Sequence, residues 1–360
     1  FLDLTNTATG TIEPGFGAGS DCASLNRDLC AMVSGRIAFG QDYNSLGEFD
    51  ASLGGALSGI LGVPINTHDF DQSRTEDFFT PTVIVEWDVT DSSMLYANFS
   101  SGYKAGGFDG QGALGDPDLF EFEEEKANSA EIGFKTSLAG GAAELNGALF
   151  YVQYDDLQVS VFDGLVGFVV DNAAEAETMG IELDGRWLVT ERLTLSGSAG
   201  YLDFEFNDWS NAQCSAGLIL AGDTNPDGES CDYSGRRNIF TPEFTASLSG
   251  EYIVPLTDII DLRTTLDVNY KSSQYVDPTL DDSIKQDAVT KINARIALES
   301  GRWSVALLGR NLTDEDSYSY ITEVPLSASV SNSVLGAGYA AYTGYQEQPR
   351  TVAVQLNYRF

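Results

Sequence analysis

The stretch TVAVQLNYRF at residues 351–360 alternates between two kinds of side chain over its whole length. Because successive side chains of a strand point to opposite faces, this pattern predicts a β-strand with one apolar and one polar face. The pattern leaves open whether the apolar face meets a protein core or lipid. The apolar or aromatic positions are Val352, Val354, Leu356, Tyr358 and Phe360.

The same alternation returns repeatedly from Thr82 onward, for example in Leu262–Lys271 and in Ala288–Glu299. Counting such segments predicts about eleven strands, mostly of about nine to thirteen residues. Strands of soluble proteins average about five or six residues, whereas a tilted membrane-spanning strand needs about nine to eleven. Strand length therefore favours lipid.

The connections alternate between short turns and long polar stretches. One brief connection near Phe162–Gly167 interrupts this order. In an up-and-down barrel, alternate connections emerge at opposite ends, and outer-membrane barrels have short turns at one end and long loops at the other. The short turns are Val89–Ser93, Ala139–Ala142, Val189–Arg192, Pro255–Ile260 and Glu299–Arg302, and the long stretches are Lys104–Lys126, Asn207–Phe240, Ser273–Gln286 and Thr313–Gln348.

Energetics assigns the two faces of each strand. If the faces of Leu262–Lys271 were exchanged, Arg263 and Asp267 would lie against lipid. A basic residue at the bilayer midplane of a barrel costs about 2–4 kcal/mol. The fold class predicted is therefore all-β, an antiparallel up-and-down transmembrane β-barrel, with Leu266 and Val268 facing lipid.

Composition excludes several functions. The chain has 54 acidic and 19 basic residues, a formal charge of -35. Nucleic-acid binding needs a basic surface, so we expect no nucleic-acid partner. With His68 as its one histidine, the sequence contains no recognisable Ser/His/Asp arrangement, and we expect no enzyme.

The first part of the chain differs from the rest. We expect residues 1–80 to be mainly an external loop region, with or without the end of a preceding strand, and residues 81–360 to form the barrel portion. The segment around Arg36–Phe39 is a candidate further strand. Ser52–Leu61 has the apolar spacing of a short amphipathic helix, although a plain loop fits equally well.

Several phrases together resemble the TonB-dependent outer-membrane receptors. They occur in the order that this family shows, from about Asp77 to the C-terminus. The phrases are FFTPTVIVEWDVTDSSMLYANFSSGYKAGGFDG (Phe78–Gly110), KANSAEIGFKTSL (Lys126–Leu138), GIELDGRW (Gly180–Trp187), GRNLTDE (Gly309–Glu315) and PRTVAVQLNYRF (Pro349–Phe360).

The resemblance implies a bacterial outer-membrane receptor that takes up a scarce ligand, typically a ferric siderophore or vitamin B12 and sometimes a sugar. Such receptors have a 22-stranded barrel and an N-terminal plug whose TonB box is pulled by TonB. Neither plug nor box is recognisable here, so we expect this chain to be the C-terminal half of the barrel. An open sheet leaves unpaired strand edges in lipid, so we do not expect it to transport alone.

The aromatic C-terminus, with Tyr358 and Phe360, resembles the signal by which the barrel-assembly machinery recognises its clients. An interfacial anchor is the alternative, and both roles can hold together. We expect removal of Phe360 to lower the amount of receptor in the outer membrane.

Four cysteines allow three disulfide pairings. Each of two local pairs lies within one inferred external loop, and the export route is oxidising. We therefore expect disulfides Cys22–Cys30 and Cys214–Cys231.

The loop between the second pair of cysteines contains DTNPDGES (Asp223–Ser230), which matches the first half of a calcium loop. Its candidate ligands are Asp223, Asn225 and Asp227, with Asp232 replacing the missing acid at the twelfth position, where Ser234 stands. A plain turn is the favoured alternative, so we expect no cofactor beyond this weak calcium candidate.

We expect ligand contacts from aromatic residues of the external loops, because aromatic faces with hydroxyl groups suit a flat chelate or a sugar ring. Loop packing and interfacial anchoring are the alternatives at each position. The rival function is a self-contained outer-membrane barrel that acts as a passive channel or structural protein. The candidate residues are Tyr103, Lys104, Phe108, Tyr318, Tyr320, Tyr339, Tyr342 and Tyr345.

Overall fold

The structure is a computed structural model, and it describes residues 73–109, 121–162, 168–172, 175–210, 212–226, 230–324 and 341–360. Within these ranges, residues 73–75, 107–109, 121–122, 162 and 168–169 belong to one compact unit and the others to a second, which holds the large sheet. Predictions that concern Cys22, Cys30, Arg36–Phe39, Ser52–Leu61 and Tyr339 lie outside the described residues.

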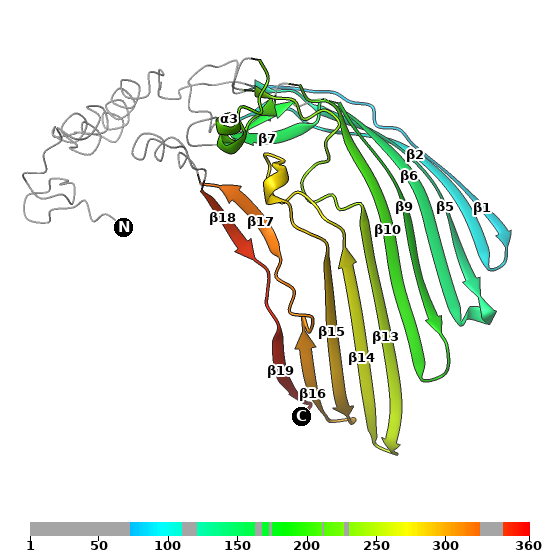
Figure 1. Cartoon of the computed structure of the whole chain (residues 1–360). Coiled ribbons are helices and arrows are strands. Elements are labelled where there is room, and N and C mark those ends of the chain that lie inside the picture. The colour runs from blue at the N-terminus through cyan, green and yellow to red at the C-terminus, as the bar shows by residue number, and fades with distance from the viewer. Residues whose placement is uncertain are drawn as a thin grey trace, which may run out of the picture. The chain divides into compact units, whose positions relative to one another are not determined.

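Eleven long strands form one antiparallel sheet, in which each strand pairs with the next long strand along the chain (Figure 1). The predicted number of strands is therefore confirmed, and β1 and β19 stand at the two ends of the order. The strands have 8 to 16 residues. They are β1 (Thr82–Thr90), β2 (Ser93–Lys104), β5 (Glu125–Leu138), β6 (Ala143–Asp155), β9 (Glu175–Leu188), β10 (Leu193–Asp208), β13 (Phe244–Thr257), β14 (Ile260–Lys271), β15 (Val289–Glu299), β16 (Trp303–Arg310) and β19 (Thr351–Tyr358).

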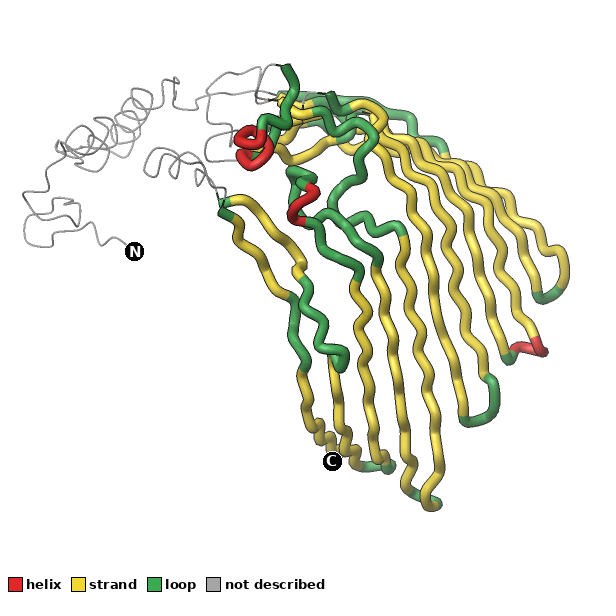
Figure 2. Tube along the Cα trace, viewed as in Figure 1, coloured by secondary structure: helices red, strands yellow, loops and turns green. Residues whose placement is uncertain are grey.

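The connections are sorted as the sequence predicts. All five short turns lie at one end of the sheet, and the long connections leave the strands at the other end (Figure 2). One short turn contains the 3-10 turn η3 (Ala139–Gly141). The long connections carry the remaining elements. These are β3 (Gly107–Phe108), β4 (Glu121–Phe122), β7 (Gln158–Phe162), β8 (Phe168–Asn172), β11 (Ala212–Gln213), α3 (Ala216–Ala221), β12 (Ser230–Cys231), η4 (Asp282–Ile284), β17 (Tyr318–Glu323) and β18 (Tyr342–Gln346).

The register confirms the two faces of the sheet. Leu266 lies opposite Gly250 on β13 and Ala294 on β15, and large apolar side chains of this face are exposed. We call this side the apolar face. Leu356 on it is 73% exposed, which a folded protein core does not allow. Its members include Leu248, Leu266, Ile296, Leu307, Val354 and Leu356.

The opposite side, which we call the polar face, carries hydrogen-bonded and charged side chains. Arg263 contacts Glu251 at 2.7 Å and Glu299 at 2.9 Å, and Arg295 contacts the same Glu299 at 3.1 Å. Ser249 donates to Asp267 at 2.6 Å. These groups satisfy one another across β13, β14 and β15, so the polar face is a network and not a set of isolated charges.

Aromatic rings cover three glycines that lie directly opposite them on neighbouring strands. Phe134 on β5 covers Gly147 on β6, where an added Cβ would come within 2.5 Å of the ring. The other two pairs are Tyr96 over Gly133 and Phe150 over Gly180. The close approach of ring to backbone explains why these positions lack a side chain.

No helix among the described residues has the length and apolar character needed to cross a membrane.

Candidate ligand-binding surface

Three long connections, those after β10, β14 and β16, fold onto one another at the ends of the strands. Two of them, the connections after β10 and β14, share a cluster of buried side chains with the polar-face side of β9 and β10. We call this assembly of three connections the loop module. The buried apolar members of the cluster are Ala176, Phe204, Phe206, Ala212, Cys214, Cys231, Tyr233, Tyr275 and Leu280.

The connection between β10 and β13 is held by a disulfide and a short helix. Cys214 and Cys231 are bonded, with their Cα atoms 5.2 Å apart. Ser215 caps α3, because its hydroxyl accepts the Leu218 N–H at 3.0 Å. The helix ends at Gly222, whose φ of 73° is the left-handed conformation that glycine adopts at low cost. Sequence analysis missed this helix.

Hydrogen bonds to backbone carbonyls join the three connections. The Arg236 guanidinium donates to the Leu280 carbonyl at 2.8 Å, and the Phe240 N–H donates to the Tyr275 carbonyl at 3.0 Å. The Ile321 N–H of β17 donates to the Val276 carbonyl at 3.0 Å. Two of these bonds join backbone groups only, so they fix where each connection runs whatever side chains it carries. The loop module is thus a structured platform.

The hairpin β17–β18 presents the predicted tyrosines on two faces. Tyr320 and Tyr345 are cross-strand partners, with ring centroids 6.5 Å apart. Tyr318 and Tyr342 lie on the other face, where the Tyr318 ring leans over Gly344. The structure therefore does not bring all four tyrosines into one site.

The first of these faces continues onto the connection between β10 and β13. The Phe240 ring lies 6.4 Å from the Tyr320 ring, and Phe240 is 47% exposed. Tyr345 is the most exposed of the three, at 66%. Phe240, Tyr320 and Tyr345 form what we call the aromatic row. Sequence analysis missed Phe240, although its position beside a long polar connection was the available signal.

The other face of the hairpin meets acidic groups. Burial, together with the negative charges of Asp281 and Glu323, raises the pKa of Tyr342 to about 12. Asp277 is 1% exposed, and its Oδ1 accepts the Thr279 N–H at 2.8 Å. Burial raises the pKa of the Asp277 carboxyl, and burial likewise raises the pKa of the Tyr233 hydroxyl. Tyr342 is therefore a protonated hydrogen-bond donor to an acid and part of the platform.

The predicted residues of the Gly-Gly-Phe loop lie elsewhere. Tyr103 shares the apolar face with Leu95 and Phe99, and its ring stacks on Phe78 with centroids 3.8 Å apart. This placement favours anchoring over ligand contact. Lys104 is the last residue of β2 and pairs in register with Glu125. Phe108 lies in β3, within the other compact unit.

The calcium candidate is partly outside the described residues, since Asp227 is not among them. Asn225 uses its amide nitrogen to donate to the Ser210 carbonyl at 2.8 Å and to Ser230 at 2.9 Å. Hydrogen bonds from the Ser234 hydroxyl and from the Ser234 N–H, the latter at 2.9 Å, lower the pKa of Asp232. No group of three His, Cys, Asp or Glu side chains suited to a metal occurs in the part of the chain that is described. Calcium binding here stays a prediction.

A model of the family described as TonB dependent receptor-like, beta-barrel matches residues 6–312, and the chain belongs to this family. The family is one of receptors in the bacterial outer membrane, which places this chain there.

Among relatives, the pesticin receptor of Yersinia enterocolitica serotype O:8 / biotype 1B is 24% identical over 280 residues, which cover 74% of this chain and 36% of that receptor. The chain thus spans about a third of the length of the curated relatives it matches.

Solved structures share the fold. The ferric yersiniabactin uptake receptor FyuA from Yersinia pestis superposes with a TM-score of 0.57 at 19% identity, covering 78% of this chain and 37% of that one. The siderophore receptor PiuA from Acinetobacter baumannii gives a TM-score of 0.55 at 15% identity, covering 77% of this chain and 35% of that one. At such identities the likeness concerns the fold alone.

Proposed function

We propose that this chain is the C-terminal part of the barrel of an energised uptake receptor. In this proposal the apolar face contacts lipid, the loop module binds a scarce small ligand such as a ferric siderophore, and TonB drives uptake through a plug encoded elsewhere in the receptor. Family membership supports the receptor class. The names of the relatives, a pesticin receptor and a ferric yersiniabactin uptake receptor, support an iron chelate as the ligand.

One observation carries the ligand-binding part of the proposal. The aromatic row lies on a hydrogen-bonded platform, so its exposed rings are held in place without a bound partner. Rigid aromatic side chains lose little conformational entropy when they bind a flat chelate. A preorganised row of rings is therefore suited to capture at low concentration.

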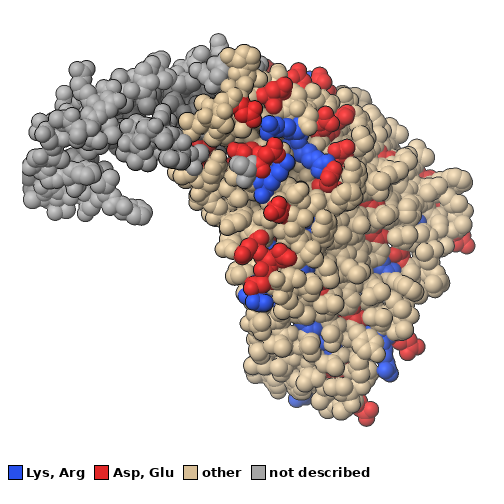
Figure 3. Space-filling model, viewed as in Figure 1, with Lys and Arg blue, Asp and Glu red and all other residues tan. Residues whose placement is uncertain are grey.

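Charge narrows the ligand class. The chain carries a formal charge of -35, and charged side chains gather near the end of the sheet that has the long connections (Figure 3). A negative field repels polyanions and attracts cations within about a Debye length. We therefore propose a ligand whose complex is neutral or positively charged.

Uptake of radioactive iron by a strain that lacks the receptor gene tests the proposal. Cells that carry the intact receptor should accumulate ferric siderophore in a saturable manner, and this uptake should disappear without TonB. Tyr345→Ala should weaken apparent affinity about fivefold, since one aromatic contact contributes about 1 kcal/mol. Tyr252→Ala, which removes a ring from the apolar face beside the short turns, should leave the apparent affinity unchanged.

Uptake that persists without TonB and rises in proportion to concentration would identify a passive channel instead. Equal affinities of the Tyr345→Ala variant and the wild type would show that Tyr345, and with it the aromatic row as proposed, does not contact the ligand.

A further inference from the structure

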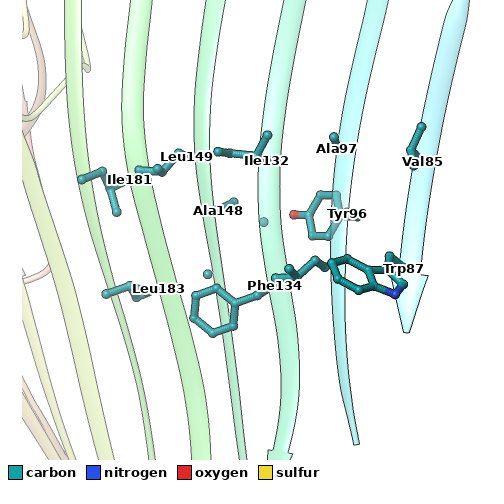
Figure 4. Close-up of a pocket in the computed structure, with 13 residues that line it drawn as sticks. Val85, Trp87, Tyr96, Ala97, Ile132, Phe134, Ala148, Leu149, Ile181 and Leu183 are labelled. Atoms are coloured by element: carbon teal, nitrogen blue, oxygen red, sulfur yellow. The ribbon is translucent and has the colours of Figure 1, made fainter. Parts of the chain in front are cut away.

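The apolar face carries a groove across β1, β2, β5, β6 and β9, with a volume of about 570 Å³ (Figure 4). Its side chains form two cross-strand rows, each in register over five strands. The upper row is Val85, Ala97, Ile132, Leu149 and Ile181, and the lower row is Trp87, Leu95, Phe134, Gly147 and Leu183.

One small residue, Ala97, gives the groove its depth, because it interrupts the upper row between Val85 and Ile132. In the lower row the space over Gly147 is filled, because the Phe134 and Leu183 side chains close over its backbone. The surface is therefore furrowed at Ala97, where a uniform row of Leu or Val would be flat.

The groove continues for one further row. A second depression shares Val85, Ala97 and Ile132 with the first and adds Phe99 and Ala130, where Ala130 is the small residue between Phe99 and Tyr151 in the third row. Adjacent rows are two residues apart, so three rows span roughly 14 Å along the strands. With a strand tilt of about 40°, this is about 11 Å along the membrane normal, whereas half of a hydrocarbon layer of about 30 Å is about 15 Å. The groove therefore covers about two thirds of the depth of one leaflet.

The position of the groove selects the leaflet. Trp87 stands three residues before the end of β1, and its indole nitrogen lies near the end of that strand, where the short turn begins (Figure 4). Tryptophan prefers the membrane interface, because its N–H can reach polar groups while its ring stays in hydrocarbon. The groove thus opens at the leaflet on the side of the short turns.

Charge at this opening selects the headgroup. The turns nearest Trp87 are residues 90–93 and 138–143, in which Asp91 is the one charged side chain, and the turn at the far edge of the groove, residues 189–192 after β9, carries Glu191 and Arg192. A carboxylate repels an anionic headgroup and attracts an ammonium group.

We propose that this groove binds one zwitterionic, ethanolamine-type glycerophospholipid of the short-turn leaflet, with an acyl chain along Ala130 and Ala97 and the headgroup beside Trp87 and Asp91. In lipid there is no hydrophobic force, so binding depends on van der Waals packing. A chain in the furrow touches protein on three sides, whereas a chain on a flat row touches it on one. This inference rests on the proposed contact of the apolar face with lipid.

Native mass spectrometry of the intact receptor, released from detergent after incubation with phosphatidylethanolamine or phosphatidylglycerol, tests the proposal. Ala97→Leu and, independently, Ala130→Leu fill the floor of the groove. Ala294→Leu is the matched control, because Ala294 lies on the apolar face between Leu266 and Gly309 and outside the groove. Heat-modifiable migration in electrophoresis verifies that each variant is folded.

The wild type should retain one phosphatidylethanolamine at collision energies that strip all others, and phosphatidylglycerol should not replace it. Occupancy should fall about fivefold in Ala97→Leu and Ala130→Leu, equivalent to about 1 kcal/mol, and stay unchanged in Ala294→Leu.

Retention of the lipid by both filled variants would overturn the proposal, as would equal retention of phosphatidylglycerol. A wild-type dimer that Ala97→Leu converts to monomers would show a second copy in the groove and overturn it as well. A receptor that is soluble and monodisperse without detergent would refute the underlying contact with lipid, which is a distinguishable result.

Discussion

Replacing Leu266 by arginine should destabilise the receptor through contact of the charge with hydrocarbon. Leu266 stands six residues beyond the start of β14, roughly 20 Å along the strand. With a strand tilt of about 40°, this is about 15 Å along the membrane normal, the centre of a hydrocarbon layer about 30 Å thick. The residues directly opposite, Gly250 and Ala294, offer no acid to pair with an arginine.

The expected cost of Leu266→Arg is about 2–4 kcal/mol in the free energy of folding into lipid. Leu262→Arg on the same face of the same strand is the depth control. It lies about 10 Å closer to the interface along the normal, so its cost should be about 1 kcal/mol or less. Urea titration of the intact receptor in phospholipid vesicles, followed by tryptophan fluorescence, measures both values. Equal costs for the two variants, or a cost below about 1 kcal/mol for Leu266→Arg, would refute the reasoning.

Four further predictions concern packing, the loop module and assembly. Gly147→Val should lower the free energy of unfolding by about 1–3 kcal/mol in a urea titration, because the new Cβ would overlap the facing Phe134 ring. Gly102→Ala, with open space around its Cβ, should leave the free energy of unfolding nearly unchanged. Equal costs for the two variants would contradict this explanation. Cys214→Ser should speed proteolysis of the loop module, since closing a loop of this length contributes about 3 kcal/mol; an unchanged cleavage rate argues against it. Because the pKa of Asp277 is raised in the folded module, its protonated carboxyl stabilises the module below the ordinary carboxyl pKa, and this stability is lost as pH rises through the raised pKa. Asp277→Asn should therefore make protease resistance independent of pH across that window. A pH dependence like that of the wild type would exclude the Asp277 carboxyl as the source of the pH dependence. Deletion of Phe360 should lower the amount of receptor in outer-membrane fractions, and an undiminished amount would leave the residue as an anchor only.

The strands and their faces could be predicted because their signal is local. In Leu262–Lys271 the alternation alone fixes that Leu266 and Arg263 lie on opposite faces, and the observed register agrees. The short turns follow from the same periodicity, since each interrupts it for only a few residues. Strand length and the sorting of connections then distinguish a membrane barrel from a soluble sandwich.

The loop module could not be predicted, because contacts distant in sequence determine it. The helix α3 has only six residues, and its Ser215 cap is a weak local signal inside a polar connection. Tyr103 is a different case, because its strand parity was readable from the sequence and places it with Phe99 on the apolar face, whereas the prediction of a ligand contact followed its neighbouring loop. Tyr320 and Tyr345, which pair across the hairpin, are 25 positions apart in the sequence, and Phe240 and Tyr320, whose rings are neighbours, are 80 positions apart.

The most direct measurement of the central claim is a nitroxide scan of the intact receptor in lipid vesicles, with a spin label placed in turn at each position from Leu262 to Tyr270. The contact of the apolar face with lipid predicts collision rates that alternate with a period of two residues. Labels at even positions should collide with oxygen, which dissolves in hydrocarbon, and labels at odd positions should collide with a water-soluble nickel complex. Equal access of the nickel complex to both sets of positions would contradict the account.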